Sequence, residues 1–360
     1  MIYMDNCATT ELSPKVVVDI CKNLNNYGNP SGLYNIGYKA RQTIEGARIK
    51  VARAIHADSN QIFFTSGATE SNNWVASMFD WISANYYEHH SIINQNNFVP
   101  IVFKENTLSR ETQPNYVYSQ MLVNNEVGFI NDVKNYLKKY KDHGSYIHSD
   151  ITQAIDNIHV DIKDLNVDFA SFSGHKFNAP KGVGVLYVKD PEDRVFNPYH
   201  YGGQQESYMR AGTENVIGIS AMGVAIEEAV SNIDIKQKHC KILRDRFIHV
   251  LNNYGLNFIV NGTDLNVDGK ILDHVDSILS LSFKGQDSSS MLVQLDMKNI
   301  CCSAGSSCNS GDSEPSETLK YLNIPNDYIN GTLRFSFSLN NTVEEVDTVC
   351  YNLNKIIRRE

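Results

Sequence analysis

The strongest constraint on the fold is an alternation of short apolar, β-rich runs with stretches of helical periodicity. The runs cover residues 61–65, 99–103, 116–123, 146–148, 167–172 and 183–188. This alternation is typical of a mostly parallel sheet covered by helices. We therefore predict an α/β fold for the first two thirds of the chain.

Helical patterns flank this region on both sides. Ser13-Pro14 is a typical N-cap and first helical residue, and it opens an apolar-periodic segment that runs to Leu24. A second helix is predicted over residues 36–54, where apolar residues recur at three- and four-residue steps. Residues 215–256 are again helical in pattern. The remainder, with strand-like runs at 277–283 and 333–338 around a helix at 288–295, predicts a smaller α+β domain.

Charge and hydropathy argue against a nucleic-acid-binding, membrane-spanning or secreted protein. The net charge of −9 and the absence of a Lys/Arg run argue against nucleic acid as a direct partner. Nowhere do ~18 apolar residues run together, so no membrane span is expected. The first residues lack the basic and apolar regions of a secretory signal, and we therefore expect a cytoplasmic protein.

The cysteines point to a reduced compartment. Seven of them are scattered along the chain, which does not suit a disulfide framework. Cys301, Cys302 and Cys308 lie close together, but no histidine or second cysteine pair nearby completes a zinc pattern, so no metal site is expected. Cys301 and Cys302, beside Ile300, are interpreted as core residues.

Four polar motifs follow directly on apolar runs, at the strand ends where α/β sheets collect ligands. The first is FTSGATESNN at 64–73, in which a helix start with small and hydroxyl residues suits a phosphate; an ordinary capped helix is the alternative. The second is VNNEVG at 123–128. Its amides and carboxylate either bind a ligand or stabilise a turn through Asn side chains.

The other two motifs carry a candidate acid–amine pair. In YIHSDITQ at 146–153, Asp150 could pair with a protonated ring nitrogen, or simply cap the next turn. In FASFSGHK at 169–176, Lys176 is a candidate Schiff-base amine, because burial among small residues lowers the pKa of a lysine. A lone lysine after a strand is usually solvent-facing, but Asp150 one strand-helix step upstream favours the functional interpretation.

Together these motifs resemble the cysteine desulfurases, which are class V aminotransferases of fold type I and depend on pyridoxal 5'-phosphate. The resemblance covers nearly the whole chain and also rests on YMDNCATT at 3–10, GNPS at 28–31, EHHSI at 88–92, RAGTEN at 210–215, SAGSSC at 303–308 and RFS at 334–336. It implies a large cofactor domain over residues 16–230 and a small domain from residues 1–15 and 231–360, which carries the Cys308 loop.

The resemblance also implies roles for individual residues. Lys176 would hold the cofactor covalently, Asp150 would pair with its ring nitrogen, and His89 would stack on the ring. The remaining cofactor residues are Asn125 and Gln153 near the phenolic oxygen, and Ala68, Thr69, Ser173 and His175 around the phosphate. Thr213 would reach the phosphate of a partner subunit, which implies a homodimer. Arg334, with Asn125, would bind the substrate carboxylate.

Cys308 lies in a Gly/Ser-rich stretch without apolar periodicity, which predicts a mobile loop. By resemblance it is the nucleophile that takes sulfur from L-cysteine, releasing L-alanine and leaving a persulfide on the enzyme. The sulfur would pass to an acceptor protein, either an iron–sulfur cluster assembly scaffold or a tRNA-thiolation protein. From the residues alone, without the resemblance, Cys308 would be interpreted as a loop thiol with no catalytic role.

Some positions depart from the family pattern, and they leave substrate preference and partner open. Tyr34 stands where histidine is common, and Gln204 and Ser338 replace glycines. The stretch between His89 and Tyr116 is shorter than usual. A related lyase or transaminase, including a selenocysteine lyase, is the alternative within enzymes; a transaminase would not need Cys308. A cofactor-free scaffold is the alternative outside them, and it would not need Lys176.

Overall fold

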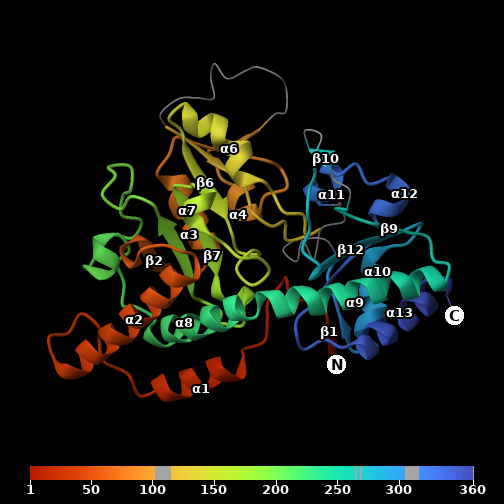
Figure 1. Cartoon of the computed structure of the whole chain (residues 1–360), viewed down its shortest axis with the longest axis horizontal. Helices are drawn as coiled ribbons and strands as arrows, with labels where there is room; N and C mark the ends of the chain where they lie inside the picture. The colour runs from red at the N-terminus through yellow and green to blue at the C-terminus, as the bar shows by residue number, and fades with distance from the viewer. Residues whose placement is uncertain (102–114, 264–265, 268–269, 305–315, 360) are drawn as a thin grey trace. The chain divides into compact units, whose positions relative to one another are not determined.

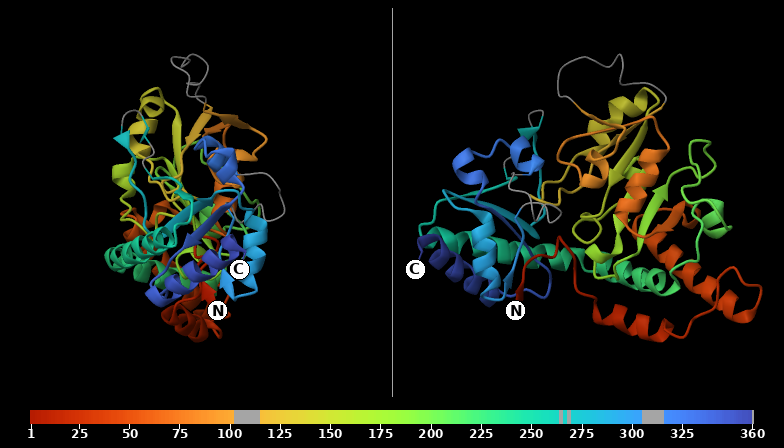
Figure 2. Two further views of the ribbon diagram at one scale, coloured as in Figure 1. Left: turned by 90° about the vertical axis from the view of Figure 1, so that its right-hand side faces the viewer. Right: turned by 180° about the vertical axis from the view of Figure 1, so that it is seen from behind.

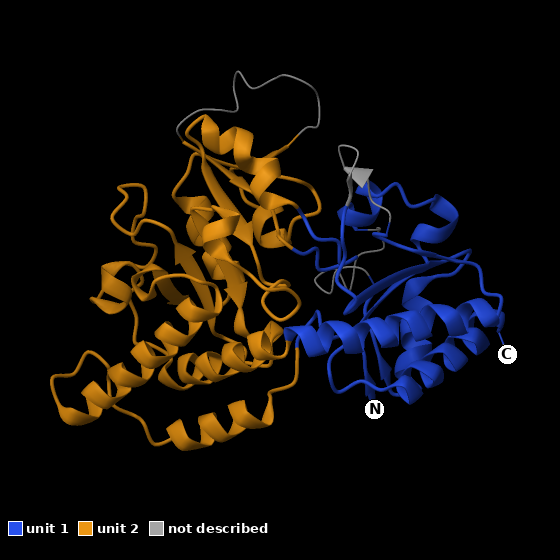
Figure 3. Cartoon of the chain, viewed as in Figure 1, with its two compact units in different colours: residues 1–9, 123–131, 233–360 blue, residues 10–122, 132–232 orange. Residues whose placement is uncertain are grey.

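The computed structural model describes residues 1–101, 115–263, 266–267, 270–304 and 316–359. It divides into two compact units (Figure 3). Unit 2 comprises Thr10–Leu122 and Asp132–Asn232, and unit 1 comprises Met1–Thr9, Val123–Asn131 and Ile233–Glu360. The chain therefore leaves unit 2 after Leu122, contributes nine residues to unit 1 and then returns to unit 2. The expected division placed these nine residues in the large domain, within residues 16–230.

In its described part, unit 2 contains a seven-stranded sheet (Figure 1). The order is β2 (Ile62–Thr65), β8 (Gly184–Val188), β7 (Phe169–Ser173), β6 (Tyr146–Asp150), β5 (Tyr116–Ser119), β3 (Trp81–Ala84) and β4 (Phe98–Pro100). β8 runs antiparallel to both of its neighbours, and the other pairs are parallel. The mostly parallel α/β sheet is thus confirmed. β3 was not predicted.

Helices pack around this sheet. In α1 (Pro14–Asn23) the Ser13 side chain accepts a hydrogen bond from the Val16 N–H, as the predicted N-cap requires. α2 (Asn35–Ala54) buries Ala40, Ile44, Ala47 and Val51, and both helices pack against α8 (Val216–Ser231). α3 (Ala68–Ser77) packs against β7 and β8. Unit 2 also contains α4 (His90–Ile93), α6 (Val133–Asp142) and α7 (Ile162–Leu165).

Unit 1 is a smaller α+β arrangement. Its described strands form the antiparallel sheet β14 (Thr332–Ser336), β12 (Ile278–Phe283) and β9 (Phe258–Val260), the parallel pair β1 (Ile2–Tyr3) and β13 (Ile300–Cys301), and the pair β10 (Asn266–Val267) and β11 (Lys270–Ile271). The helices are α9 (Ile233–Asn253), α10 (Ser288–Asp296), α11 (Glu317–Tyr321), α12 (Asn326–Ile329) and α13 (Val343–Arg358). α9 and α13 lie side by side in both directions of view (Figures 1 and 2), and Phe247, Phe335 and Phe337 fill the core beneath them.

Among the described residues, no single helix has the length and apolar composition of a membrane span. Only α8 and α9 taken together pass such a test, and a bend of 66° separates them.

Candidate active site

Three predicted cofactor residues lie together at strand ends of unit 2. Asp150 is the last residue of β6, and Lys176 ends a one-turn 3₁₀ helix, Gly174–Lys176, that follows β7 directly. His89 is the N-cap of α4, just after β3. The charges of Asp150 and Lys176 both act on the His89 ring, which places the three groups within electrostatic reach of one another.

Asp150 is held by hydrogen bonds on both of its oxygens. It is 6% exposed; its Oδ1 accepts from the Thr152 N–H at 2.9 Å, and its Oδ2 accepts from Asn72 Nδ2 at 2.9 Å. The first bond is the turn-capping role that the sequence left open. The second belongs to a chain in which Asn72 Nδ2 also donates to Ser91 Oγ at 2.8 Å, and Ser91 Oγ lies 2.7 Å from His89 Nδ1. Asp150 and His89 are therefore fixed by one hydrogen-bonded chain, in which Asn72 and Ser91 were not predicted.

The imidazole of His89 is neutral near neutral pH. Burial lowers its pKa below the ordinary value, and Lys176 and His90 act in the same direction against the opposing charge of Asp150. The Ser91 N–H donates to His89 Nδ1 at 3.1 Å, so Nδ1 accepts and the proton lies on Nε2. A neutral, oriented imidazole can stack on a flat aromatic ring.

His175, which precedes Lys176, also has a lowered pKa. Burial first, and then the charges of Lys176 and Lys181, lower its pKa to about 4. Its backbone carbonyl accepts hydrogen bonds from the N–H and the hydroxyl of Thr10. This holds the backbone of the short helix that carries Lys176.

Two further titratable groups are buried near Asp150, and sequence reasoning missed both. Burial raises the pKa of Glu88 to about 8, against a hydrogen bond that its carboxylate accepts from the Met121 N–H at 2.5 Å. Burial also lowers the pKa of His148 to about 4. The His148 ring lies between two hydroxyls, Ser119 Oγ at 2.8 Å and Ser171 Oγ at 3.0 Å. It thereby ties β5, β6 and β7 together below the strand ends.

The N-terminus of α3 is the candidate phosphate site. The Ala68 N–H donates to Ser173 Oγ at 2.6 Å, so the structure brings these two predicted residues together. Thr69 is exposed on the same first turn. Gly184 of β8 lies so close to this turn that an added Cβ would come within 2.4 Å of the Gly67 Cα. A helix N-terminus with a hydroxyl beside it suits an anion.

Gln153 and Thr213 are the remaining predicted residues of unit 2. Gln153 is buried one turn after Asp150, and its backbone carbonyl accepts a hydrogen bond from Asn157 Nδ2 at 2.8 Å. Thr213 is exposed, and it lines a cavity of about 240 Å³ together with Ser66 and Arg210. With a buried carboxylate, a neutral imidazole, an amine and a helix N-terminus, unit 2 fits a phosphorylated pyridine cofactor.

Asn125 and Arg334 belong to unit 1 and contact each other. Arg334 is 1% exposed; its Nη1 donates to the Asn125 carbonyl at 2.8 Å and its Nη2 to Asp5 Oδ1 at 3.0 Å. Burial works against its charge, but Cys7 and Asp5 outweigh this effect and keep the pKa of Arg334 above the ordinary value. The guanidinium is therefore a fixed positive charge.

Described residues on either side of the stretch that carries Cys308 contact Arg334 and the neighbouring Glu126. Ser303 exchanges two backbone hydrogen bonds with Arg334, at 3.1 and 2.7 Å. On the other side, Thr318 Oγ1 donates to Glu126 Oε1 at 3.2 Å. Cys308 itself lies outside the described residues.

The cysteines before this stretch and the VNNEVG motif also have definite surroundings in unit 1. Cys301 and Cys302 were expected to be buried core residues, but both are half-buried. Cys302 packs against the core of the unit. Asn124 Oδ1 accepts from the N–H groups of Glu126 and Val127, both at 3.0 Å. This is the Asn-stabilised turn that the sequence left as an alternative.

Comparisons with known proteins identify the family. The family model for aminotransferase class-V matches residues 2–100 and 102–349. A cysteine desulfurase IscS from Clostridium botulinum is 34% identical, over 99% of this chain and 94% of the relative; one from Methanosarcina thermophila is 34% identical, over 99% and 92%. The solved structure of a NifS-like protein from Rickettsia africae has a TM-score of 0.88 at 28% identity, and covers 99% of both chains. The chain belongs to the class-V aminotransferases and, within them, to the cysteine desulfurase family.

Proposed function

We propose that this chain is a cysteine desulfurase that depends on pyridoxal 5'-phosphate and leaves the sulfur of L-cysteine as a persulfide on Cys308, with release of L-alanine. The observation that carries the proposal is the hydrogen-bonded chain from Asp150 through Asn72 and Ser91 to His89, within electrostatic reach of Lys176. These hydrogen bonds orient a carboxylate and a neutral imidazole around an amine, as a pyridine cofactor with an aldehyde requires.

The cofactor contacts follow from these positions. Lys176 would hold the cofactor, Asp150 its ring nitrogen and His89 its face, with Gln153 and Asn125 near the phenolic oxygen. Its phosphate would lie at the α3 N-terminus, with Ala68, Thr69, Ser173 and His175. When bound, the cofactor supplies an electron sink for charge that develops on the substrate.

The substrate contacts come from unit 1. Arg334 would bind the substrate carboxylate through its planar fork, with Asn125 beside it. Asp5 keeps the guanidinium oriented, since it accepts from Arg334 Nη2 at 3.0 Å. Lys176, once its amine is free, would take the proton from the substrate α-carbon.

Sulfur transfer is assigned to Cys308. As a thiolate it attacks the substrate sulfur, so that an S–S bond forms while the bond from the substrate Cβ to sulfur breaks. The carbon skeleton then takes up a proton and leaves as alanine. The persulfide would pass to an iron–sulfur scaffold or a tRNA-thiolation protein.

We further propose a cytoplasmic homodimer in which Thr213 completes the phosphate site of the partner. Exposed apolar side chains on α1 and α2, among them Val17, Val18, Ile36 and Tyr38, support a surface that is covered in the assembly.

Alanine formation from cysteine tests this function. The wild type should form alanine and carry one extra sulfur on Cys308 by mass spectrometry. Cys308→Ser should keep the cofactor and lose both products, whereas Cys21→Ser, which alters an exposed thiol of α1, should change neither. Lys176→Ala should abolish the covalent link to the cofactor that borohydride reduction makes permanent in the wild type. Alanine formation at the wild-type rate by Cys308→Ser would refute the role of this cysteine and favour a lyase that does not use it.

A further inference from the structure

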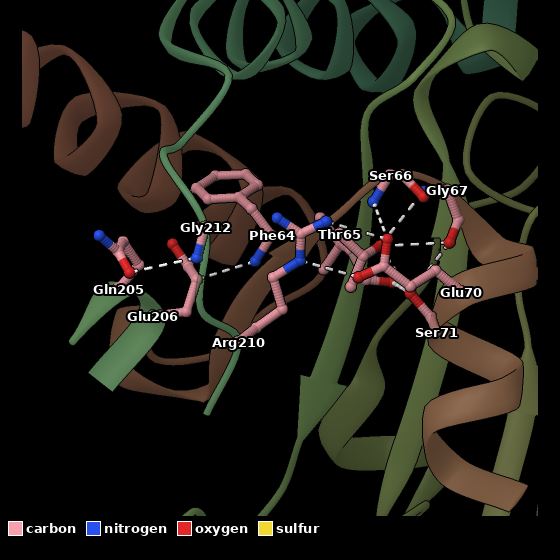
Figure 4. A network of polar contacts seen from close by, with 11 residues as sticks. Phe64, Thr65, Ser66, Gly67, Glu70, Ser71, Gln205, Glu206, Arg210 and Gly212 are labelled. Carbon is pink, nitrogen blue, oxygen red and sulfur yellow. Dashed lines mark hydrogen bonds and ion pairs between the residues drawn. The ribbon is translucent and has the colours of Figure 1, made fainter. Parts of the chain in front are cut away.

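Two carboxylate–guanidinium pairs, Arg48–Glu206 and Arg210–Glu70, hold the segment that follows β8 against α2 and α3. Figure 4 shows the second pair and the hydrogen bond from the Phe64 N–H to Glu206. In the first, both oxygens of Glu206 accept from Arg48, at 2.8 Å each, and Oε2 also accepts from the Phe64 N–H at 2.9 Å. Both side chains are largely buried. Glu206 is thereby anchored to α2 and to β2 at the same time.

The backbone at this anchor is strained. Glu206, Ser207 and Tyr208 all have positive φ angles, of 45°, 56° and 70°. Residues other than glycine rarely adopt this conformation, and it persists only where surrounding contacts enforce it. The three hydrogen bonds on Glu206 are such contacts, and the turn that they enforce carries the chain on toward Arg210.

Arg210 forms the second pair, and this one reaches the candidate phosphate site. Its Nε donates to Glu70 Oε1 at 2.9 Å and its Nη2 to Glu70 Oε2 at 3.2 Å. Glu70 Oε2 also accepts from the Ser66 N–H at 2.8 Å. Figure 4 shows the Arg210 fork facing Glu70, with Ser66 and Gly67 on the far side of the carboxylate.

The charge of Glu70 matters at this position. It lies in the first turn of α3, within the stretch whose backbone would hold the cofactor phosphate. Burial opposes its ionisation, but hydrogen bonds from Arg210 and Ser66 outweigh burial and hold the pKa of Glu70 below its ordinary value. An ionised carboxylate here would repel a bound phosphate unless a cation offset it.

We infer that Arg210 is a positioning residue for the cofactor phosphate: through Glu70 it fixes the Ser66–Gly67 turn, and it offsets the carboxylate charge beside the phosphate. This inference rests on the proposed function, because it takes the α3 N-terminus as the phosphate site. It distinguishes the two partners of the pair. Loss of Arg210 leaves an unbalanced carboxylate near the phosphate, whereas loss of Glu70 leaves an unbalanced cation.

The test compares the binding of two ligands to the apoprotein, pyridoxal 5'-phosphate and pyridoxal, which lacks the phosphate. Binding is followed by the visible absorption of the bound cofactor. Arg210→Gln should weaken binding of the phosphorylated ligand roughly tenfold and leave that of pyridoxal unchanged. Adding Glu70→Gln to this variant should restore part of the loss, because the repelling charge is then gone.

Two matched variants complete the design. Arg246→Gln breaks another bidentate pair, Arg246–Asp347 at 2.7 and 2.8 Å in unit 1, and should change the binding of neither ligand. Arg210→Lys keeps the charge without the fork, so it should fold even if Arg210→Gln does not, and should weaken binding of the phosphorylated ligand by less than about threefold.

The outcomes separate the inference from the function beneath it. Equal weakening of both ligands by Arg210→Gln, an unchanged affinity, or no recovery with Glu70→Gln would overturn the positioning role alone. If Arg210→Gln does not fold, a loss in Arg210→Lys that is equal for the two ligands would overturn it. A wild-type chain that binds neither ligand would overturn the proposed function, and this inference with it.

Discussion

Replacement of His148 by glutamine should change how stability depends on pH. His148 is completely buried between Ser119 Oγ and Ser171 Oγ, and burial lowers its pKa to about 4 from the ordinary 6.5. Between these two values the unfolded chain binds a proton that the folded chain does not. The free energy of unfolding therefore falls as the pH falls from about 6.5 toward 4.

The magnitude follows from the two pKa values. At about 1.4 kcal/mol for each tenfold difference in proton affinity, the full effect of His148 is about 3 kcal/mol. Roughly 1 kcal/mol of this is lost between pH 7 and pH 5.5, because the unfolded histidine is already mostly protonated at pH 5.5. The contributions of His89 and His175, whose pKa values are lowered too, come in addition.

Urea unfolding of the apoprotein measures this effect. Both tryptophans of the chain, Trp74 and Trp81, lie in unit 2, so their fluorescence follows the unit that contains His148. His148→Gln should be less stable than wild type at pH 7, yet lose about 1 kcal/mol less on going to pH 5.5. His143→Gln, at an exposed position after α6, should lose as much as wild type. An equal loss in wild type and His148→Gln would refute the argument.

Two more predictions concern buried guanidinium groups. Arg48→Gln should lower the free energy of unfolding of unit 2 by about 3 kcal/mol, because Glu206 is left as a buried, unbalanced charge; the same fluorescence measurement checks it, and a loss below 1 kcal/mol would contradict it. Arg334→Lys should raise the KM for cysteine at least about tenfold while the cofactor stays bound, because a lysine cannot reproduce the planar fork; steady-state kinetics check this, and an unchanged KM would contradict it.

The elements and the strand ends were largely predictable from local patterns. Apolar runs and helical periodicity are signals within a few residues, so β6 and β7 were expected, and with them the positions of Asp150 and Lys176 at strand ends. β3 escaped prediction because Ile82 is its only large buried side chain: Trp81 is exposed, and Ser83 and Ala84 are small.

The supporting contacts could not be predicted in the same way. Asn72 and Asp150 lie 78 positions apart, and Arg48 and Glu206 lie 158 positions apart. Which side chains meet across such separations depends on strand register and helix packing. Neither can be deduced from the pattern of a few consecutive residues. The burial of His148 likewise depends on the strands on either side of β6, and these follow from the sheet order.

The pairing of β1 with β13 has a consequence for synthesis on the ribosome. Ile2 pairs with Ile300, so β1 leaves the ribosome about 300 residues before its partner exists. At about 5–20 residues per second, this wait lasts roughly 15–60 s. Throughout that time β1 lacks its partner, and its unpaired backbone groups can pair with other chains. Because β1 has only two residues, it offers few backbone groups for such pairing. Its shortness therefore limits aggregation of the nascent chain until β13 has been synthesised.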